Sequence, residues 1–197
     1  MSLLDYLVEV RKKNVIVVDI QPEYKSYIRF DMEECMNFLN SQRDLLVFFN
    51  GPDTVGQSSS DVILRWWYQQ GFDLHNYKKT VRWIDKGYGF FRTWMDQGVD
   101  EKRIQEVVRY MVMNRISDSR LIPDDILLDF VEGYHKGVDD EFLLQDPIYL
   151  PHISLGMLKK WSGSYLIGGG RNECLKEIKI LLDTFNIRYT IVKKFSF

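Results

Sequence analysis

Hydrophobic residues form short unbroken runs near the start of the chain, and a polar residue follows each run. The runs VIVVDI at 15–20 and LLVFFN at 45–50 are rich in β-branched and aromatic residues and show no polar alternation. Such runs are typical of strands that are covered on both faces of a parallel sheet. Asp31 begins a segment with helical spacing between them, so this region predicts a strand–helix–strand unit. A short helix is expected before it, over 2–13.

The C-terminal part of the chain repeats this pattern. SYLIGGG at 164–170 predicts a strand that runs into glycines, and RYTIVKKF at 188–195 predicts a further strand at or near an edge of the sheet. The segment between them has apolar residues at helical spacing. Asn172 can cap this helix, and Asn186 can close it in the left-handed conformation.

The middle of the chain, 58–151, has a different character. Its spacing predicts helices over 61–70 and 100–114 and another that Pro123 opens, and TVRWI at 80–84 is a candidate fifth strand. We interpret this part as a mainly helical, aromatic-rich insertion packed on the sheet. The whole chain, 1–197, is then expected to be a single α/β domain, a three-layer sandwich with a mainly parallel sheet.

Composition narrows the class of protein. The chain has 197 residues, 45% hydrophobic and 27% charged, with a formal net charge of −2. These fractions exclude a disordered or collagen-like chain and argue against non-specific polyanion binding. Two cysteines cannot make a disulfide framework, no run approaches the ~20 apolar residues of a membrane span, and the start lacks signal-peptide features. We therefore expect a soluble, cytoplasmic protein without membrane association.

Polar residues follow the predicted strands at one rim of the sheet, which is where ligands bind in parallel α/β sheets. Asp19 and Gln21 follow the first strand, Asn50 follows the second, and GGGRNEC at 168–174 follows the third. A carboxylate at a strand end can act as a base or a metal ligand, and a cysteine in the first turn of a helix has a stabilised thiolate. Two simpler interpretations remain open: Asp19 only stops its strand, and Cys174 is a small buried hydrophobe.

The pairing of VIVVDIQ with a late strand–glycine–cysteine–helix–strand resembles the isochorismatase-like cysteine hydrolases, over the two ends of the chain only. The resemblance implies a small amide or ester-like substrate, a Cys174 nucleophile, an Asp19 base and no cofactor. It also implies that backbone N–H groups at 172–174 bind the oxyanion, and that the remaining polar residues of the rim bind substrate: Gln21, Asn50, Arg171 and Asn172. The family's catalytic lysine is expected near 146–150, where QDPIYLPH has none.

An alternative set of residues at this rim is acidic. Asp19, Asp53 and Glu173 could converge on Mg²⁺ or Mn²⁺, which prefer hard oxygen ligands. Further carboxylates could join them from Asp85, Asp118 and Asp146. An apolar strand ending in Asp, with a late acidic helix start, is similar to the PIN-like nucleases, and implies a nucleic-acid substrate cut with metal assistance.

A third hypothesis is a non-catalytic binding protein on the same fold. The segment VRWIDKGYGFFRTWMDQG mixes aromatic rings with cations, which can stack on bases and hold phosphates, or can form the core of a helical cap. The basic residues in this segment and directly before it are Lys78, Lys79, Arg82, Lys86 and Arg92. Among the histidines, only His152 is near the predicted rim of the sheet. The protein could also form a homo-oligomer.

Overall fold

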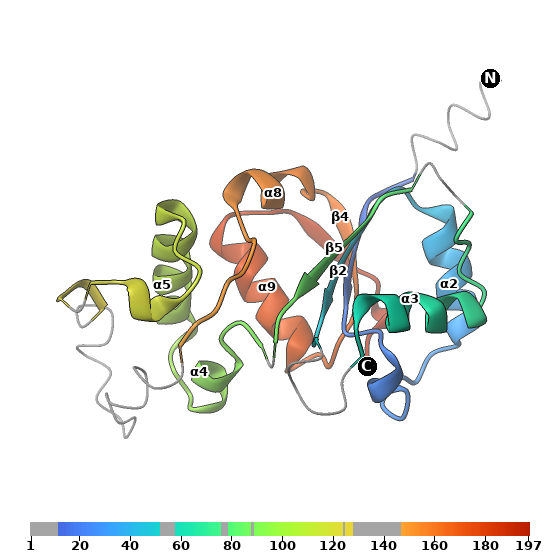
Figure 1. Cartoon of the computed structure of the whole chain (residues 1–197), viewed down its shortest axis with the longest axis horizontal. Helices are drawn as coiled ribbons and strands as arrows, with labels where there is room; N and C mark the ends of the chain where they lie inside the picture. Colours follow the sequence, from blue (N-terminus) through green and yellow to red (C-terminus); the bar gives the residue numbers. More distant parts are fainter. Residues whose placement is uncertain (1–11, 52–57, 76–78, 88, 124, 128–146) are drawn as a thin grey trace.

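Five parallel strands form one sheet, in the order β3-β2-β1-β4-β5, in the computed structural model of the described residues. These residues are 12–51, 58–75, 79–87, 89–123, 125–127 and 147–197 (Figure 1). The strands are β1 (Val15–Val18), β2 (Leu45–Phe49), β3 (Val81–Asp85), β4 (Ser164–Gly168) and β5 (Tyr189–Ile191). The predicted parallel sheet is confirmed, including the fifth strand from the middle of the chain and the edge position of the last strand.

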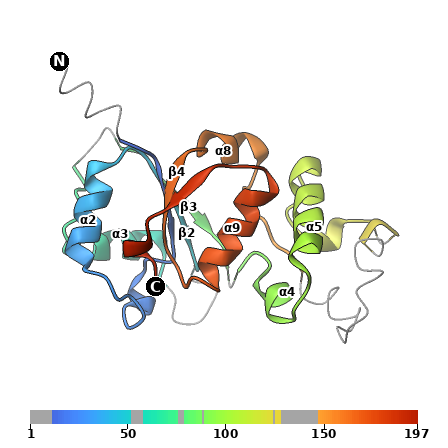
Figure 2. The ribbon, with the colours of Figure 1, turned by 180° about the vertical axis from the view of Figure 1, so that it is seen from behind.

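Helices cover both faces of the sheet, so the molecule is a three-layer sandwich (Figures 1 and 2). Helices α2 (Met32–Ser41) and α3 (Ser60–Gln69) pack on one face. Core residues of α8 (Leu155–Lys160) and α9 (Cys174–Thr184) pack on the other face, and α5 (Glu101–Asn114) packs against α9. The remaining short elements are α4 (Arg92–Asp96) and the 3₁₀ turns η1 (Pro22–Tyr24), η2 (Ser119–Leu121) and η3 (Lys193–Phe195).

The predicted caps explain where several helices begin and end. Asp31 accepts a hydrogen bond from the backbone of Glu34 and starts α2, and Asp100 caps α5 in a similar way. Asn186 has a φ of 54° just after α9, as predicted. The prediction for Asn172 is wrong: α9 starts at Cys174, and no side chain caps it. The helix expected over 2–13 lies outside the described residues, apart from its last two positions.

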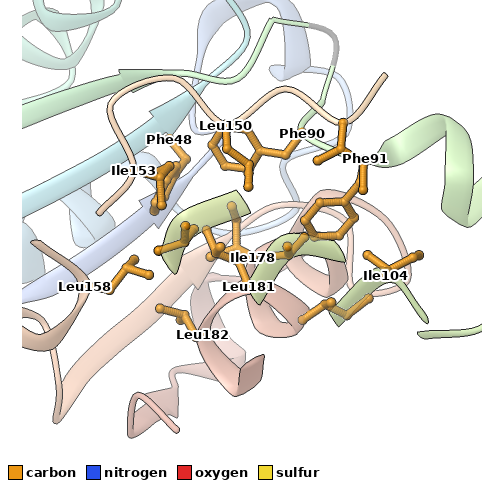
Figure 3. Close-up of a cluster of buried hydrophobic side chains, with 14 of the residues drawn as sticks. Phe48, Phe90, Phe91, Ile104, Leu150, Ile153, Leu158, Ile178, Leu181 and Leu182 are labelled. Atoms are coloured by element: carbon orange, nitrogen blue, oxygen red, sulfur yellow. The ribbon is translucent and has the colours of Figure 1, made fainter. Parts of the chain in front are cut away.

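The larger hydrophobic core lies between the sheet and α9 (Figure 3). Phe48 of β2 and Ile178 and Leu181 of α9 are fully buried there, beside the aromatic residues Phe90 and Phe91. The aromatic-rich segment after β3 is thus core, as the helical-cap interpretation predicts. It anchors the segment that follows β3 against α9.

The chain reverses its direction of winding between β1 and β4. Strands β2 and β3 add successively on one side of β1, and β4 and β5 add on the other, each in parallel register. In open parallel sheets, a crevice forms at such a reversal, outside the carboxyl ends of the two strands. Asp19 follows β1 and the glycines follow β4, so both flank this crevice.

No helix in the described parts of the chain is both long enough and apolar enough to span a bilayer.

Candidate active site

Three neighbouring parallel strands each end in a polar residue of the site. Asp19 follows β1, Asn50 follows β2 and Lys86 follows β3. The backbone N–H of Asp19 donates to Phe48 O and that of Lys86 donates to Phe49 O, which extends the sheet ladder by one residue. The three side chains therefore come from adjacent strand ends at one rim, and all three are buried.

Lys86 is the centre of a buried charge cluster. Its Nζ lies 2.9 Å from Asp19 Oδ2, donates to Asn50 Oδ1 at 2.7 Å, and lies 3.8 Å from Glu177 Oε2. Lys86, Asp19 and Glu177 are each about 1% exposed. Breaking such a pair by removing one member leaves an uncompensated buried charge, which is why all the members depend on one another.

Asp19 is held in an unusual backbone conformation. Its φ is 50°, in the left-handed region, which costs a non-glycine residue about 1–3 kcal/mol, although Asp tolerates it better than most. Apart from the ion pair with Lys86, neither carboxylate oxygen accepts a well-aligned hydrogen bond from another described group. A buried carboxylate with unused acceptor capacity can accept a hydrogen bond from a further donor in the site.

Helix α9 brings Cys174 and Glu177 to the same cluster. They are three residues apart, hence on one face of the helix, and the Cys174 thiol interacts with the Asp19 carboxylate. Glu177 Oε1 accepts the backbone N–H of Phe91 at 2.9 Å. The Glu173 N–H, expected to help bind an oxyanion, donates to Gly170 O instead, whereas the Cys174 N–H has no acceptor among the described residues.

The pKa values of the cluster differ from the sequence-based expectation. Burial raises the pKa of the Cys174 thiol to about 12, and the Asp19 carboxylate adds to this while Lys86 opposes it. The expectation of a stabilised thiolate is therefore wrong, because burial and a neighbouring carboxylate outweigh the helix N-terminus. Burial lowers the pKa of Lys86, but Asp19 and Glu177 outweigh it and the net pKa is raised. Burial raises the pKa of Glu177.

A cavity of about 600 Å³ opens onto Asp19, Asn50 and Cys174. Its volume is that of a site for a small organic molecule. The rest of its lining comes from segments that are far apart in the sequence: Tyr24, Tyr27, Arg29, Arg92, Gly170, Glu173 and Phe197. Arg92 donates hydrogen bonds from Nε to the Asp96 carboxylate and forms a longer ion pair with Glu173. Arg29 donates a hydrogen bond from Nη1 to the backbone carbonyl of Ser26.

The structure brings four of the six predicted catalytic and substrate-binding residues together. Asp19, Asn50 and Cys174 line the cavity, and Gln21 lies behind it, where its side chain pairs with both backbone groups of Asn50. Gln21 thus holds Asn50 in place and does not line the cavity. Arg171 and Asn172 do not line this cavity: their exposed turn lines a separate hollow beside Lys176 and Asp183, and their role as substrate ligands stays a prediction.

The alternative metal ligands do not form a cluster in the described residues. No group of three or more histidine, cysteine and acidic side chains there is arranged to hold a metal ion. Asp53, Asp146 and His135 lie outside the described residues. Glu173 is exposed beside Arg92, Asp85 accepts the N–H groups of Gly51 and Gly87, and Asp118 is paired with Arg120.

Lys86 and Glu177 are the site residues that sequence reasoning missed in this role. The resemblance places a lysine near 146–150, whereas the lysine of the site directly follows β3. The sequence signal for Lys86 was its position directly after TVRWID, because that strand ends next to the strand that Asn50 follows. Glu177 also left a signal, because its place on α9 falls on the apolar face, where an acid needs a buried partner.

Comparison of the chain with known protein families finds no family that matches, and comparison with curated proteins finds no significant relative.

Proposed function

We propose that this protein is a cysteine hydrolase of the isochorismatase type, acting on a small amide or ester. The observation that carries the proposal is that Asp19 and Cys174 line one cavity and that Lys86 is buried behind them: a buried carboxylate is paired with a buried ammonium, beside a thiol. A nucleophile next to a base, with the base oriented by a third group, is the general arrangement for covalent catalysis.

In the first step, the Cys174 Sγ attacks the carbonyl carbon of the substrate and the thiol proton passes to Asp19. The proton transfer overcomes the high pKa of the thiol, because Asp19 accepts the proton as the S–C bond forms. The oxyanion that develops can be bound by the Cys174 N–H at the start of α9, where the helix dipole also favours negative charge. Lys86 offsets the negative charge that passes between sulfur and carboxylate.

In the second step, the protonated Asp19 returns its proton to the leaving amine or alcohol, and a thioester remains on Cys174. Asp19, again ionised, then takes a proton from a water molecule that attacks the thioester carbon. The acid product leaves, the Asp19 proton returns to sulfur, and the resting thiol is restored. Each bond that breaks is matched by a proton transfer through Asp19, and no oxidant or reductant is needed.

The test uses p-nitrophenyl acetate and a panel of small primary amides with the full-length protein. We expect release of p-nitrophenolate and, by intact-mass measurement, a transient acetyl group on Cys174. Cys174→Ala should lower the rate by at least about 1000-fold, and Asp19→Asn by roughly 100- to 10,000-fold. Cys35→Ala is the matched control, since Cys35 is a core residue of α2 remote from the cavity, and it should keep the wild-type rate.

Other outcomes would contradict this function. Cleavage of single-stranded nucleic acid that requires Mg²⁺ or Mn²⁺, is lost in Asp19→Asn and survives in Cys174→Ala would select a metal-dependent nuclease. Absence of turnover on every ester and amide, with tight binding of a small molecule in the cavity, would select a binding protein. EDTA should leave the hydrolase activity unchanged.

A further inference from the structure

Glu177 is a buried acid whose role the hydrolase mechanism does not explain. It is about 1% exposed on the inward face of α9, a place where an acid is costly unless it is paired. Its two carboxylate oxygens contact different parts of the site. Oε1 accepts the Phe91 N–H at 2.9 Å and Oε2 lies 3.8 Å from Lys86 Nζ.

These contacts join the nucleophile helix to the segment that carries the lysine. Lys86 directly follows β3 and Phe91 is five residues later, and both contact the Glu177 side chain, one helical turn beyond Cys174. The fit is close at Gly89, which has a φ of 156°, and a Cβ there would lie 3.1 Å from Glu177 Oε1 and 2.6 Å from Arg92 Cβ. The segment after β3 is thus shaped to approach Glu177.

The ammonium of Lys86 has three N–H donors, and three acceptor groups surround it. They come from Asp19 after β1, Asn50 after β2 and Glu177 on α9. Without Glu177, two acceptors remain and both belong to neighbouring strand ends, so nothing would fix the ammonium relative to α9.

We propose that Glu177 is a positioning residue of the active site, which fixes Lys86 and the segment after β3 against α9 so that the lysine stands between Asp19 and Cys174. The kinetic test of this inference rests on the proposed function, whereas the alkylation test does not. The charged and titratable groups that interact with Glu177 are Asp19 and Lys86 at the strand ends and Cys174 on its own helix.

Two variants separate the contacts of Glu177. Glu177→Gln keeps an oxygen for the Phe91 N–H but removes the charge that faces Lys86, and Glu177→Leu removes both. Asp183→Asn is the matched control: it removes one carboxylate from the exposed end of the same helix. The full-length proteins are compared by the kcat and KM of p-nitrophenyl acetate hydrolysis and by the pH dependence of Cys174 alkylation with iodoacetamide.

We expect kcat to fall in Glu177→Gln with KM little changed, and to fall by about 100-fold in Glu177→Leu, the loss that a misplacement of about 1 Å can cause. We also expect the alkylation profile of Glu177→Gln to move to lower pH, because the Glu177 charge is one of the factors that raise the pKa of Cys174. A residue that only fills space would leave this profile unmoved. Asp183→Asn should match the wild type in both measurements.

The inference is overturned if Glu177→Gln keeps both the wild-type kcat and the wild-type alkylation profile. If the wild type hydrolyses no ester or amide, the proposed function fails, but the alkylation profiles still decide the role of Glu177. If Glu177→Leu does not fold, the outcome depends on Glu177→Gln, which retains the hydrogen bond to Phe91.

Discussion

Cys174 begins α9, where the helix dipole favours a thiolate, yet its surroundings favour the thiol. Burial and the Asp19 carboxylate raise its pKa to about 12, and Lys86 only partly offsets them. The sequence could indicate both residues, since each follows a core strand or opens a helix at one rim. It could not indicate the protonation state, which depends on how deeply the fold buries the thiol and on which charges surround it.

Alkylation of Cys174 should therefore be slow at neutral pH. We expect its rate with iodoacetamide to rise about tenfold per pH unit up to about pH 11, since only the thiolate reacts. Asp19→Asn should increase the alkylation rate at any given pH although the proposed mechanism expects it to lower turnover, because it removes a carboxylate that raises the thiol pKa. Mass mapping of the modified peptide distinguishes Cys174 from Cys35. A rate that levels off near pH 7 would contradict this prediction.

Lys86 should stabilise the folded protein strongly. Lys86→Met leaves Asp19 and Glu177 buried without their cation, so the free energy of unfolding should fall by about 3–5 kcal/mol near pH 7. Urea unfolding followed by circular dichroism measures this loss. Lys176→Met, an exposed lysine of α9, is the control and should change stability little.

The pH dependence of this loss follows from the raised pKa of Lys86. The folded state holds the proton more tightly than the unfolded state, so the contribution is complete below the ordinary lysine pKa of 10.5. It is lost as the pH rises above that value. The difference in stability between wild type and Lys86→Met should thus be constant from pH 8 to 10 and shrink above about pH 10.5. A difference that grows in that range would be inconsistent with a paired Lys86.

At the level of elements, the contact of β4 with β1 sets the distance between the two halves of the site. Gly168 ends β4 opposite Val18 with a φ of 82°, and a Cβ there would lie 2.1 Å from Val18 O. The sequence indicated a glycine-rich strand end and the helix that follows it. It did not indicate how close the two backbones come, because register between distant strands is fixed only when the sheet assembles.

Gly168→Ala should destabilise the protein by more than about 1 kcal/mol and also reduce turnover, since it pushes apart the strand ends that carry Asp19 and the Cys174 loop. Gly163→Ala is a matched control. Gly163 also has a positive φ, 86°, but a Cβ there meets nothing within 4 Å, so only the cost of the backbone conformation remains. Chemical unfolding and ester hydrolysis of both variants test the difference. Equal losses in the two would mean that the β1–β4 contact is not tight.

At the level of the whole molecule, the cavity collects residues from segments that are distant in the chain. The parallel sheet, its two covered faces and the grouping of Asp19, Asn50 and Cys174 could be predicted from strand ends alone. Lys86 could not be assigned by resemblance, because the expected position was counted from the last strands rather than from the strand next to Asn50. Proximity in sequence also could not indicate which arginine lines the cavity: Arg171 is near Cys174 in the chain but lies outside the cavity, whereas Arg29 lines it.

Arg29 should therefore determine how acidic substrates bind. Arg29 lines the cavity, and a charge-assisted hydrogen bond from an arginine to a substrate carboxylate is worth about 1.5–3 kcal/mol, or roughly 10- to 100-fold in KM. Arg29→Gln should raise KM for mono-p-nitrophenyl succinate by that factor and leave KM for p-nitrophenyl acetate unchanged. Arg171→Gln should change neither. An increase in KM for the succinate ester in Arg171→Gln, and not in Arg29→Gln, would contradict this prediction and would indicate that Arg171 binds the substrate carboxylate.

The protonated resting state of Cys174 has a consequence for the life of the protein in the presence of oxidants. Peroxides attack thiolates, so a neutral thiol beside a carboxylate oxidises slowly to the sulfenic acid. In the proposed mechanism, nucleophilicity arises only while a carbonyl compound occupies the cavity and the proton moves to Asp19. Such an active site can tolerate oxidative stress that would inactivate a permanently ionised cysteine.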